Sequence, residues 1–313
     1  DSKRYLLVPE GQPVPRGLDE DVSILQEPLQ NIYLVASGAM DMFASLDAVD
    51  QIRFSGQKQE NWYIQTAKDA MAAGDMIYAG KYSKPDYELL VSEGCDLAIE
   101  NRMITHSPEV VEMLQSFDIP VMIEYSSYEQ HPLGKVEWVK FFGALTGKEA
   151  KAEEAFAEQT EILEEVESGE KTGKTIAFFY VTSNGLIQVR QSTDYIPKLI
   201  ELAGGRYIFE NLEDSGSGRS TLNMQVEDFY AGAKDADILI YNSSIDGGVT
   251  TVDELIGKCN ILKDFKAVQE GQVYCTTNDM YQQSMAIGYL LQDMHTVLTD
   301  DDTAKLRYLF LLQ

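Results

Sequence analysis

Short apolar runs alternate along this chain with segments in which apolar residues recur every three or four positions. Residues 32–36 form an apolar run that predicts a buried strand, and apolar residues follow it at helical spacing from Met40 to Leu46. A helix that leads into a strand is then predicted twice, over residues 87–100 and 108–124. Helices and strands that alternate with short links predict a mainly parallel sheet covered by helices on both faces.

A long helical segment follows this first lobe and precedes a second one. The helical pattern runs from Gly134 to about Ser168, and a helix of about twenty residues spans about 30 Å. Beyond Gly173 the strand and helix pattern restarts. We therefore predict an α/β protein of two lobes with central, mainly parallel sheets, joined by a single long connecting helix. The predicted bounds are 1–145 for the N-terminal lobe, 146–170 for the connecting helix and 171–313 for the C-terminal lobe.

One helix-to-strand unit has a counterpart in the second lobe. In the first lobe, residues 86–90 lead to a strand that begins at Asp96. In the second lobe, residues 227–230 lead to a strand that begins at Asp237. Few residues are identical, but their order is the same, so the second lobe echoes the first.

The composition describes a folded and strongly acidic protein. Hydrophobic residues make up 44% of the 313 residues, and 51 acidic against 25 basic residues give a formal net charge of -26. This charge disfavours DNA or RNA as a partner, because nucleic-acid binding depends on neutralising phosphates. No apolar stretch approaches the twenty or so residues of a membrane span. The polar start at Asp1 is not a signal peptide, so we expect a mature or trimmed chain that a leader and a lipid-anchoring cysteine could precede.

The three cysteines predict no metal site and no disulfide framework. Cys95, Cys259 and Cys275 contain no CxxC pair and no regular spacing. Cys259 and Cys275 are close enough in sequence to leave two alternatives open, a bridge between them or two free thiols.

Five segments in the same order resemble one class of ABC solute-binding proteins, in which two α/β lobes are joined by one long rigid helix. They lie at residues 31–50, 84–99, 143–150, 199–205 and 265–274. The resemblance implies a monomeric, extracytoplasmic protein, periplasmic or a cell-surface lipoprotein, that binds without catalysis and needs no cofactor. Such a protein captures an iron–siderophore complex, haem or a corrinoid such as cobalamin, and delivers it to a membrane permease driven by an ATPase. In that family an acidic residue of each lobe docks on the permease, which implies Glu88 and Asp228 here, with Glu227 as the alternative to Asp228.

The ligand is expected at the loops that follow the strands, because open parallel sheets bind ligands outside the carboxyl ends of their strands. Tyrosine and arginine are abundant in these loops, and they suit a large planar anion such as an iron chelate or a tetrapyrrole. Arg102 and Arg190 are the strongest candidates, because each directly follows a predicted strand. The candidate ligand contacts are Arg102, Arg190, Tyr78, Tyr82, Tyr125, Tyr128, Ser183, Asn184, Tyr241, Asn242 and Tyr281.

Two alternative functions and one alternative ligand remain open at this point. A chelatase-like enzyme could use a similar two-lobed frame, and a sensing module would need the same site without import. His131 is either an axial ligand to haem iron or a loop histidine before Pro132. Three scattered histidines disfavour the capture of bare zinc or manganese, so no other protein ligand to a metal is predicted.

Overall fold

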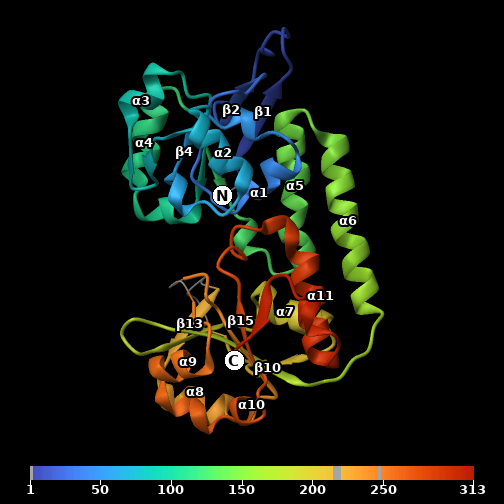
Figure 1. The fold of residues 1–313 in the computed structure, drawn as a ribbon. Coiled ribbons are helices and arrows are strands. Elements are labelled where there is room, and N and C mark those ends of the chain that lie inside the picture. The colour runs from blue at the N-terminus through green and yellow to red at the C-terminus, as the bar shows by residue number, and fades with distance from the viewer. Residues whose placement is uncertain (1–2, 214–219, 246–247) are drawn as a thin grey trace. The chain divides into compact units, whose positions relative to one another are not determined.

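The computed structural model describes residues 3–213, 220–245 and 248–313, and the chain divides into two compact units (Figure 1). Unit 1 comprises Asp1–Ser126 and Glu137–Phe156, and unit 2 comprises Ser127–Val136 and Ala157–Gln313. Two helices, α5 (Pro132–Thr146) and α6 (Glu149–Glu167), contribute residues to both units. The segment 127–136 therefore packs with the second unit, although it lies within the first predicted lobe.

Unit 1 is built on a sheet of five strands that are all parallel. Their order is β5-β4-β3-β8-β9. The strands are β3 (Ile32–Leu34), β4 (Phe54–Ser55), β5 (Ile77–Tyr78), β8 (Leu97–Asn101) and β9 (Val121–Glu124). The helices between them are α1 (Ala39–Ser45), α2 (Gln65–Ala73), α3 (Tyr87–Ser92) and α4 (Pro108–Ser116). This is the parallel sheet that the alternating pattern predicts.

Helices cover the unit 1 sheet because its strands are apolar on both faces. Leu90 of α3 and Leu114 of α4 join Tyr33 and Ala98 of the sheet in one buried cluster. Helices α1 and α5 pack together through Phe43 and Phe142, whose ring centres are 5.1 Å apart. Figure 1 shows α3 and α4 on one side of this unit and α1 and α5 on the other.

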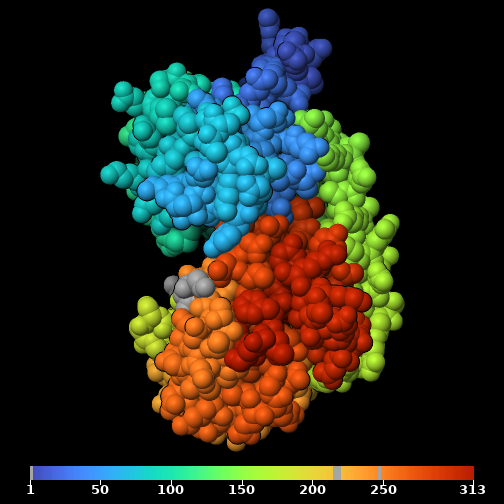
Figure 2. Space-filling model, viewed as in Figure 1, coloured from blue at the N-terminus to red at the C-terminus, as the bar shows by residue number. Residues whose placement is uncertain are grey.

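A two-stranded ribbon near the N-terminus belongs to unit 1 but not to its sheet. It pairs β1 (Arg4–Val8) with β2 (Val22–Gln26) in parallel, and residues 9–21 between them are almost all exposed. Figures 1 and 2 show it projecting from the rest of the unit. The Tyr5 hydroxyl ties its base to β9 by donating to the carbonyl oxygen of Val121 at 2.9 Å. A second small pair, β6 (Gly80–Lys81) and β7 (Lys84–Pro85), follows β5.

Unit 2 is built on a seven-stranded sheet that is parallel only in its middle. The order is β13-β11-β10-β14-β15-β16, and β12 also pairs with β10. The strands are β10 (Thr175–Val181), β11 (Ile187–Arg190), β12 (Arg206–Tyr207), β13 (Thr221–Met224), β14 (Ile238–Tyr241), β15 (Val273–Thr276) and β16 (Leu309–Leu311). Strands β11, β13 and β16 join antiparallel. Strand β11 runs antiparallel to β10 because a tight turn, with Gly185 at φ 81°, links the two strands. Such a turn is too short for the crossover that parallel strands need.

Two groups of helices cover the unit 2 sheet. The core contains Phe179 of the sheet and Phe229 of α8, whose ring centres are 4.9 Å apart, with Phe265 stacked on Phe229 at 5.5 Å. The helices on this side are α8 (Val226–Ala233), α9 (Val252–Lys258) and α10 (Lys266–Gln269). Helix α11 (Ile287–Thr299) packs on α7 (Tyr195–Leu202), where Nδ1 of His295 lies 2.9 Å from the carbonyl oxygen of Ala203. Figure 1 shows α7 and α11 apart from α8 to α10.

The echo between the two halves of the sequence corresponds to a repeated hydrogen-bond arrangement. Just before β8, the Asp96 carboxylate accepts from the backbone N–H groups of Gln30 and Asn31, both at 2.9 Å, at the start of the neighbouring β3. Just before β14, the Asp237 carboxylate accepts from the backbone N–H and the hydroxyl of Thr175, at 2.7 and 2.8 Å, at the start of the neighbouring β10. In each unit an aspartate thus holds the amino ends of two adjacent parallel strands together.

The cysteines are free thiols, so the second of the two alternatives for Cys259 and Cys275 holds in this structure. Both of these side chains are buried. Burial also raises the pKa of the Cys95 thiol to about 12, which keeps it protonated and unreactive near neutral pH.

Candidate ligand-binding site

The carboxyl ends of the unit 1 strands lie along one edge of the sheet, because all five strands are parallel. The backbone N–H groups of Val35 and Ala36, after β3, both donate to the carbonyl oxygen of Ile99 in β8. Gly56, after β4, lies so close to this segment that a Cβ atom on it would be 2.8 Å from the Cα atom of Val35. The candidates of unit 1 that end or follow these strands, Tyr78, Arg102 and Tyr125, are therefore brought to one edge.

These unit 1 candidates differ in exposure. Tyr78 and Tyr125 are exposed, at 41% and 40%. Arg102 is half-buried and begins a short helical turn. The side-chain oxygen of Asn101 caps this turn by accepting from the backbone N–H of Met103 at 2.9 Å. Tyr82 is half-buried and packs against the α3 and α4 side of the core, between β6 and β7. Tyr78, Arg102 and Tyr125 thus fit a ligand-facing position better than Tyr82.

Arg190 of unit 2 is a buried cation with a fixed partner. Its side chain is 9% exposed, and its guanidinium lies 3.5 Å from the carboxylate of Asp194, whose side chain is 2% exposed. The guanidinium carbon is also 5.8 Å from the ring centre of Phe178. Burial opposes the charge, but the Asp194 carboxylate and nearby tyrosines raise the pKa of Arg190 above its ordinary value. Arg190 therefore stays charged, and Asp194 compensates it.

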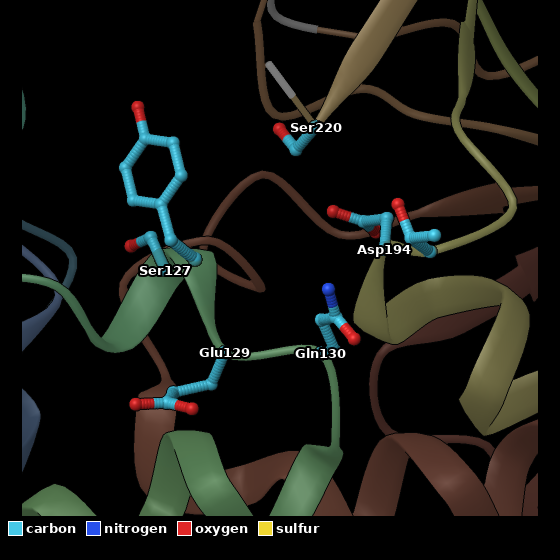
Figure 3. A pocket seen from close by; sticks show the side chains of 7 residues that line it. Ser127, Glu129, Gln130, Asp194 and Ser220 are labelled. Carbon is cyan, nitrogen blue, oxygen red and sulfur yellow. The ribbon is translucent and has the colours of Figure 1, made fainter. Parts of the chain in front are cut away.

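A polar pocket of about 160 Å³ opens beside this ion pair, within unit 2. Figure 3 shows Gln130, Asp194 and Ser220 around the cavity, with Ser127 and Glu129 on neighbouring turns. Three distant stretches of sequence form it, before α5, before α7 and before β13. The residues that line it are Ser127, Tyr128, Glu129, Gln130, Thr193, Asp194 and Ser220.

Sequence reasoning found only part of this pocket. Tyr128 was among the candidates, but Thr193, Asp194 and Ser220 were not. One signal was available, because an aspartate before an apolar helical run is an N-cap signature, and Asp194 accepts from the backbone N–H of Ile196 at 3.0 Å at the start of α7. The same signal does not reveal that Asp194 meets Arg190.

Other unit 2 candidates lie away from the pocket. Ser183 and Asn184 are exposed in the turn between β10 and β11. Tyr241 is fully buried in the core, with its ring centre 5.6 Å from that of Phe179, so its side chain does not face a ligand at the sheet edge. Asn242 is 3% exposed, and its side-chain oxygen accepts from the Ser244 hydroxyl at 2.6 Å. Tyr281, at 49% exposure, is open to solvent after β15.

His131 has a structural role at the start of α5. Its Nδ1 accepts from the backbone N–H of Leu133 at 3.2 Å, as a helix cap does. In the ranges that the structure describes, no group of three or more His, Cys, Asp or Glu side chains is placed to hold a metal ion. This bond uses Nδ1 and fits a loop histidine before Pro132, while the role of axial ligand to haem iron stays a prediction.

The carboxylates implied for docking are exposed near the starts of helices. Glu88 lies in the first turn of α3, and Asp228 lies with Glu227 in the first turn of α8. A carboxylate in a first helical turn is stabilised by the helix dipole, so these positions also have a local structural reason.

Comparisons with known proteins cover most of the chain. A sequence model described as periplasmic binding protein matches residues 36–280. An uncharacterized lipoprotein of Methanocaldococcus jannaschii is 24% identical, over 95% of this chain and 72% of its own length.

Solved structures share the fold. A possible iron-binding (periplasmic solute-binding) protein from Staphylococcus epidermidis matches with a TM-score of 0.65 at 17% identity, covering 86% of this chain and 98% of that one. A periplasmic heme-binding protein from Vibrio cholerae matches with a TM-score of 0.67 at 14% identity, covering 85% and 98%. These matches confirm the predicted fold class, an α/β architecture with parallel sheet cores.

Proposed function

Because this chain belongs to the periplasmic binding protein family, we propose that it is the extracytoplasmic solute-binding component of an ABC importer and that its solute is a metal chelate. The family match covers residues 36–280 and therefore includes the strands of both units from β4 to β15. The protein binds rather than catalyses, as its family does. In the part of the chain that the structure describes, no helix is long and apolar enough to cross a membrane.

The observation that carries this proposal is the buried, charged Arg190 beside a polar pocket. Placing a guanidinium at 9% exposure costs desolvation energy, and a buried charge with a specific partner beside an opening is a mark of functional sites. An opening of about 160 Å³ beside this fixed charge has room for one polar group of a larger solute, which supports a role in recognition. The expected solutes are an iron–siderophore complex, haem or a corrinoid.

The proposed partners are a membrane permease and its ATPase. Glu88 and Asp228 are exposed and would dock on basic residues of the permease. The M. jannaschii relative is named a lipoprotein, which supports a position at the outer face of the cytoplasmic membrane or in a periplasm.

The first test is the absorbance spectrum of protein purified from its native host, in which haem, corrinoids and ferric chelates have different bands. Calorimetry with the chelate so identified should then show that Arg190→Gln weakens binding about ten-fold or more, because Asp194, which lines the pocket, loses the buried partner that holds it. Arg206→Gln is the matched control, since Arg206 is exposed and pairs with Glu210 at 3.4 Å on the surface of unit 2.

Thermal unfolding of each variant separates loss of binding from loss of fold, because Arg190→Gln leaves the buried Asp194 without its partner. Unchanged affinity in a folded Arg190→Gln protein would remove Arg190 from the site. A protein that binds no ferric chelate, haem or corrinoid would contradict the proposed function.

A further inference from the structure

The charges around the unit 2 pocket balance one another. Two carboxylates, Asp194 and Glu129, line it. Two buried cations contact a lining residue or its neighbour, Arg190 with a 9% exposed side chain and Lys135 at 7% exposure. The Lys135 ammonium sits 4.8 Å from the ring centre of Tyr195, the residue after Asp194. Among the described residues that line or directly support the pocket, positive and negative side chains are therefore equal in number.

The two helix starts beside the pocket are also already capped. Asp194 accepts from the backbone N–H of Ile196 at the start of α7, and His131 accepts from the backbone N–H of Leu133 at the start of α5. Helix N-termini attract anions through their free N–H groups and their dipoles. Since each start already has an acceptor of its own, this attraction is largely met before a solute arrives.

The remaining lining groups are neutral and can both donate and accept hydrogen bonds. They are the hydroxyls of Ser127, Tyr128, Thr193 and Ser220 and the amide of Gln130. The volume of about 160 Å³ is room for roughly five water molecules, or for one small polar group of a larger solute. A neutral amide or hydroxyl group can exchange hydrogen bonds with this lining without adding charge.

We propose that the part of the solute that enters this pocket is uncharged, as an amide, hydroxamate or hydroxyl group is, and that Asp194 sets this preference by compensating Arg190. The inference rests on the proposed function and narrows its solute class. A carboxylate or catecholate in the pocket would meet two carboxylates, while Arg190 is already compensated by Asp194, so it is repelled. From the sequence alone, Arg190 suggests an anionic solute. Its pairing with Asp194, which changes this expectation, is seen only in the folded structure.

The test compares two iron complexes of different charge by calorimetry, a neutral ferric trihydroxamate and the anionic ferric citrate complex. Wild type should bind the neutral complex at least about ten-fold more tightly. Asp194→Asn keeps a good helix cap but removes the compensating charge, so it should raise affinity for ferric citrate about ten-fold. Glu201→Gln is the control, since it makes the same charge change on α7 where Glu201 pairs with Lys198 at 2.9 Å outside the pocket lining.

A second measurement needs no chelate. At equal ionic strength, replacing chloride with acetate should raise the unfolding midpoint of Asp194→Asn by about 2 °C and leave wild type and Glu201→Gln unchanged. If acetate acts this way but neither iron complex binds, the charge inference holds, and the proposed function is contradicted when haem and corrinoids also fail to bind. If acetate affects wild type and Asp194→Asn alike, or if wild type prefers ferric citrate, the inference is overturned.

Discussion

Glu100 is a carboxyl group in an environment that disfavours its charge, and it allows a quantitative prediction. It lies in β8 of unit 1 with 0% exposure, and neither carboxyl oxygen has a hydrogen-bond partner among the described residues. It is close enough to Tyr33 and Tyr87 to affect the pKa of both hydroxyls. Burial raises the pKa of Glu100 from an ordinary value of 4.5 to about 8, so the group is mostly protonated at neutral pH.

The sign of the resulting pH dependence follows from proton binding. Between pH 4.5 and about 8 the folded protein holds a proton on Glu100 that the unfolded chain has released. The free energy of unfolding therefore falls as pH rises through this window, by about 1.4 kcal/mol per pH unit. From pH 4.5 to pH 7 the expected loss is about 3 kcal/mol, a large share of the stability of an ordinary domain.

Glu100→Gln removes this titration and keeps the shape of the side chain. Relative to wild type, the variant should gain about 3 kcal/mol of unfolding free energy between pH 4.5 and pH 7. The assay is urea unfolding at several pH values, followed by tryptophan fluorescence. Both tryptophans of the chain, Trp62 and Trp138, belong to unit 1, so the signal reports the unit that contains Glu100.

The exposed Glu112 of α4 provides the control, because Glu112→Gln makes the same substitution at the surface of the same unit. Its stability relative to wild type should change little with pH. A difference between Glu100→Gln and wild type that stays constant from pH 4.5 to pH 7 would refute the reasoning, since it would mean that Glu100 titrates alike in the folded and unfolded chains.

Two further predictions concern how the sheets are held. Burial opposes ionisation of Asp237, but hydrogen bonds from Lys266 and Thr175 lower its pKa to about 2. Asp237→Asn should therefore lower the free energy of unfolding by about 1–2 kcal/mol at pH 7. This difference from wild type should shrink as pH falls from about 4 towards 2, and acid unfolding curves that keep it constant would contradict the prediction. Gly56→Ala would place a Cβ atom 2.8 Å from the Cα atom of Val35. We therefore expect urea unfolding to show that unit 1 loses about 1–3 kcal/mol of unfolding free energy. A loss near zero would show that the segments after β3 and β4 can move apart.

Much of the local structure could be predicted from the sequence. The strand expected at residues 32–36 is β3 (Ile32–Leu34), and the helix-to-strand unit expected over residues 87–100 is α3 (Tyr87–Ser92) followed by β8 (Leu97–Asn101). The parallel sheet of unit 1 follows from helices that alternate with strands, since each crossover returns the chain to the same edge. The aspartates before β8 and β14 are also visible in the sequence as an echo. These features depend on periodicity and on neighbours within a few residues.

The tertiary structure decided which side chains meet and which way they face. Strand pairing makes β11 antiparallel to its neighbour. It also decides that the Tyr241 side chain of β14 faces the core. The pocket joins residues near positions 127, 193 and 220, which are distant in sequence. The charge state of the site depends on such contacts as well, because Asp194 compensates Arg190 only where the fold brings their side chains to 3.5 Å in a buried place. Sequence periodicity identifies the elements, but desolvation and charge compensation act through space, so they were determined only by the packing of those elements.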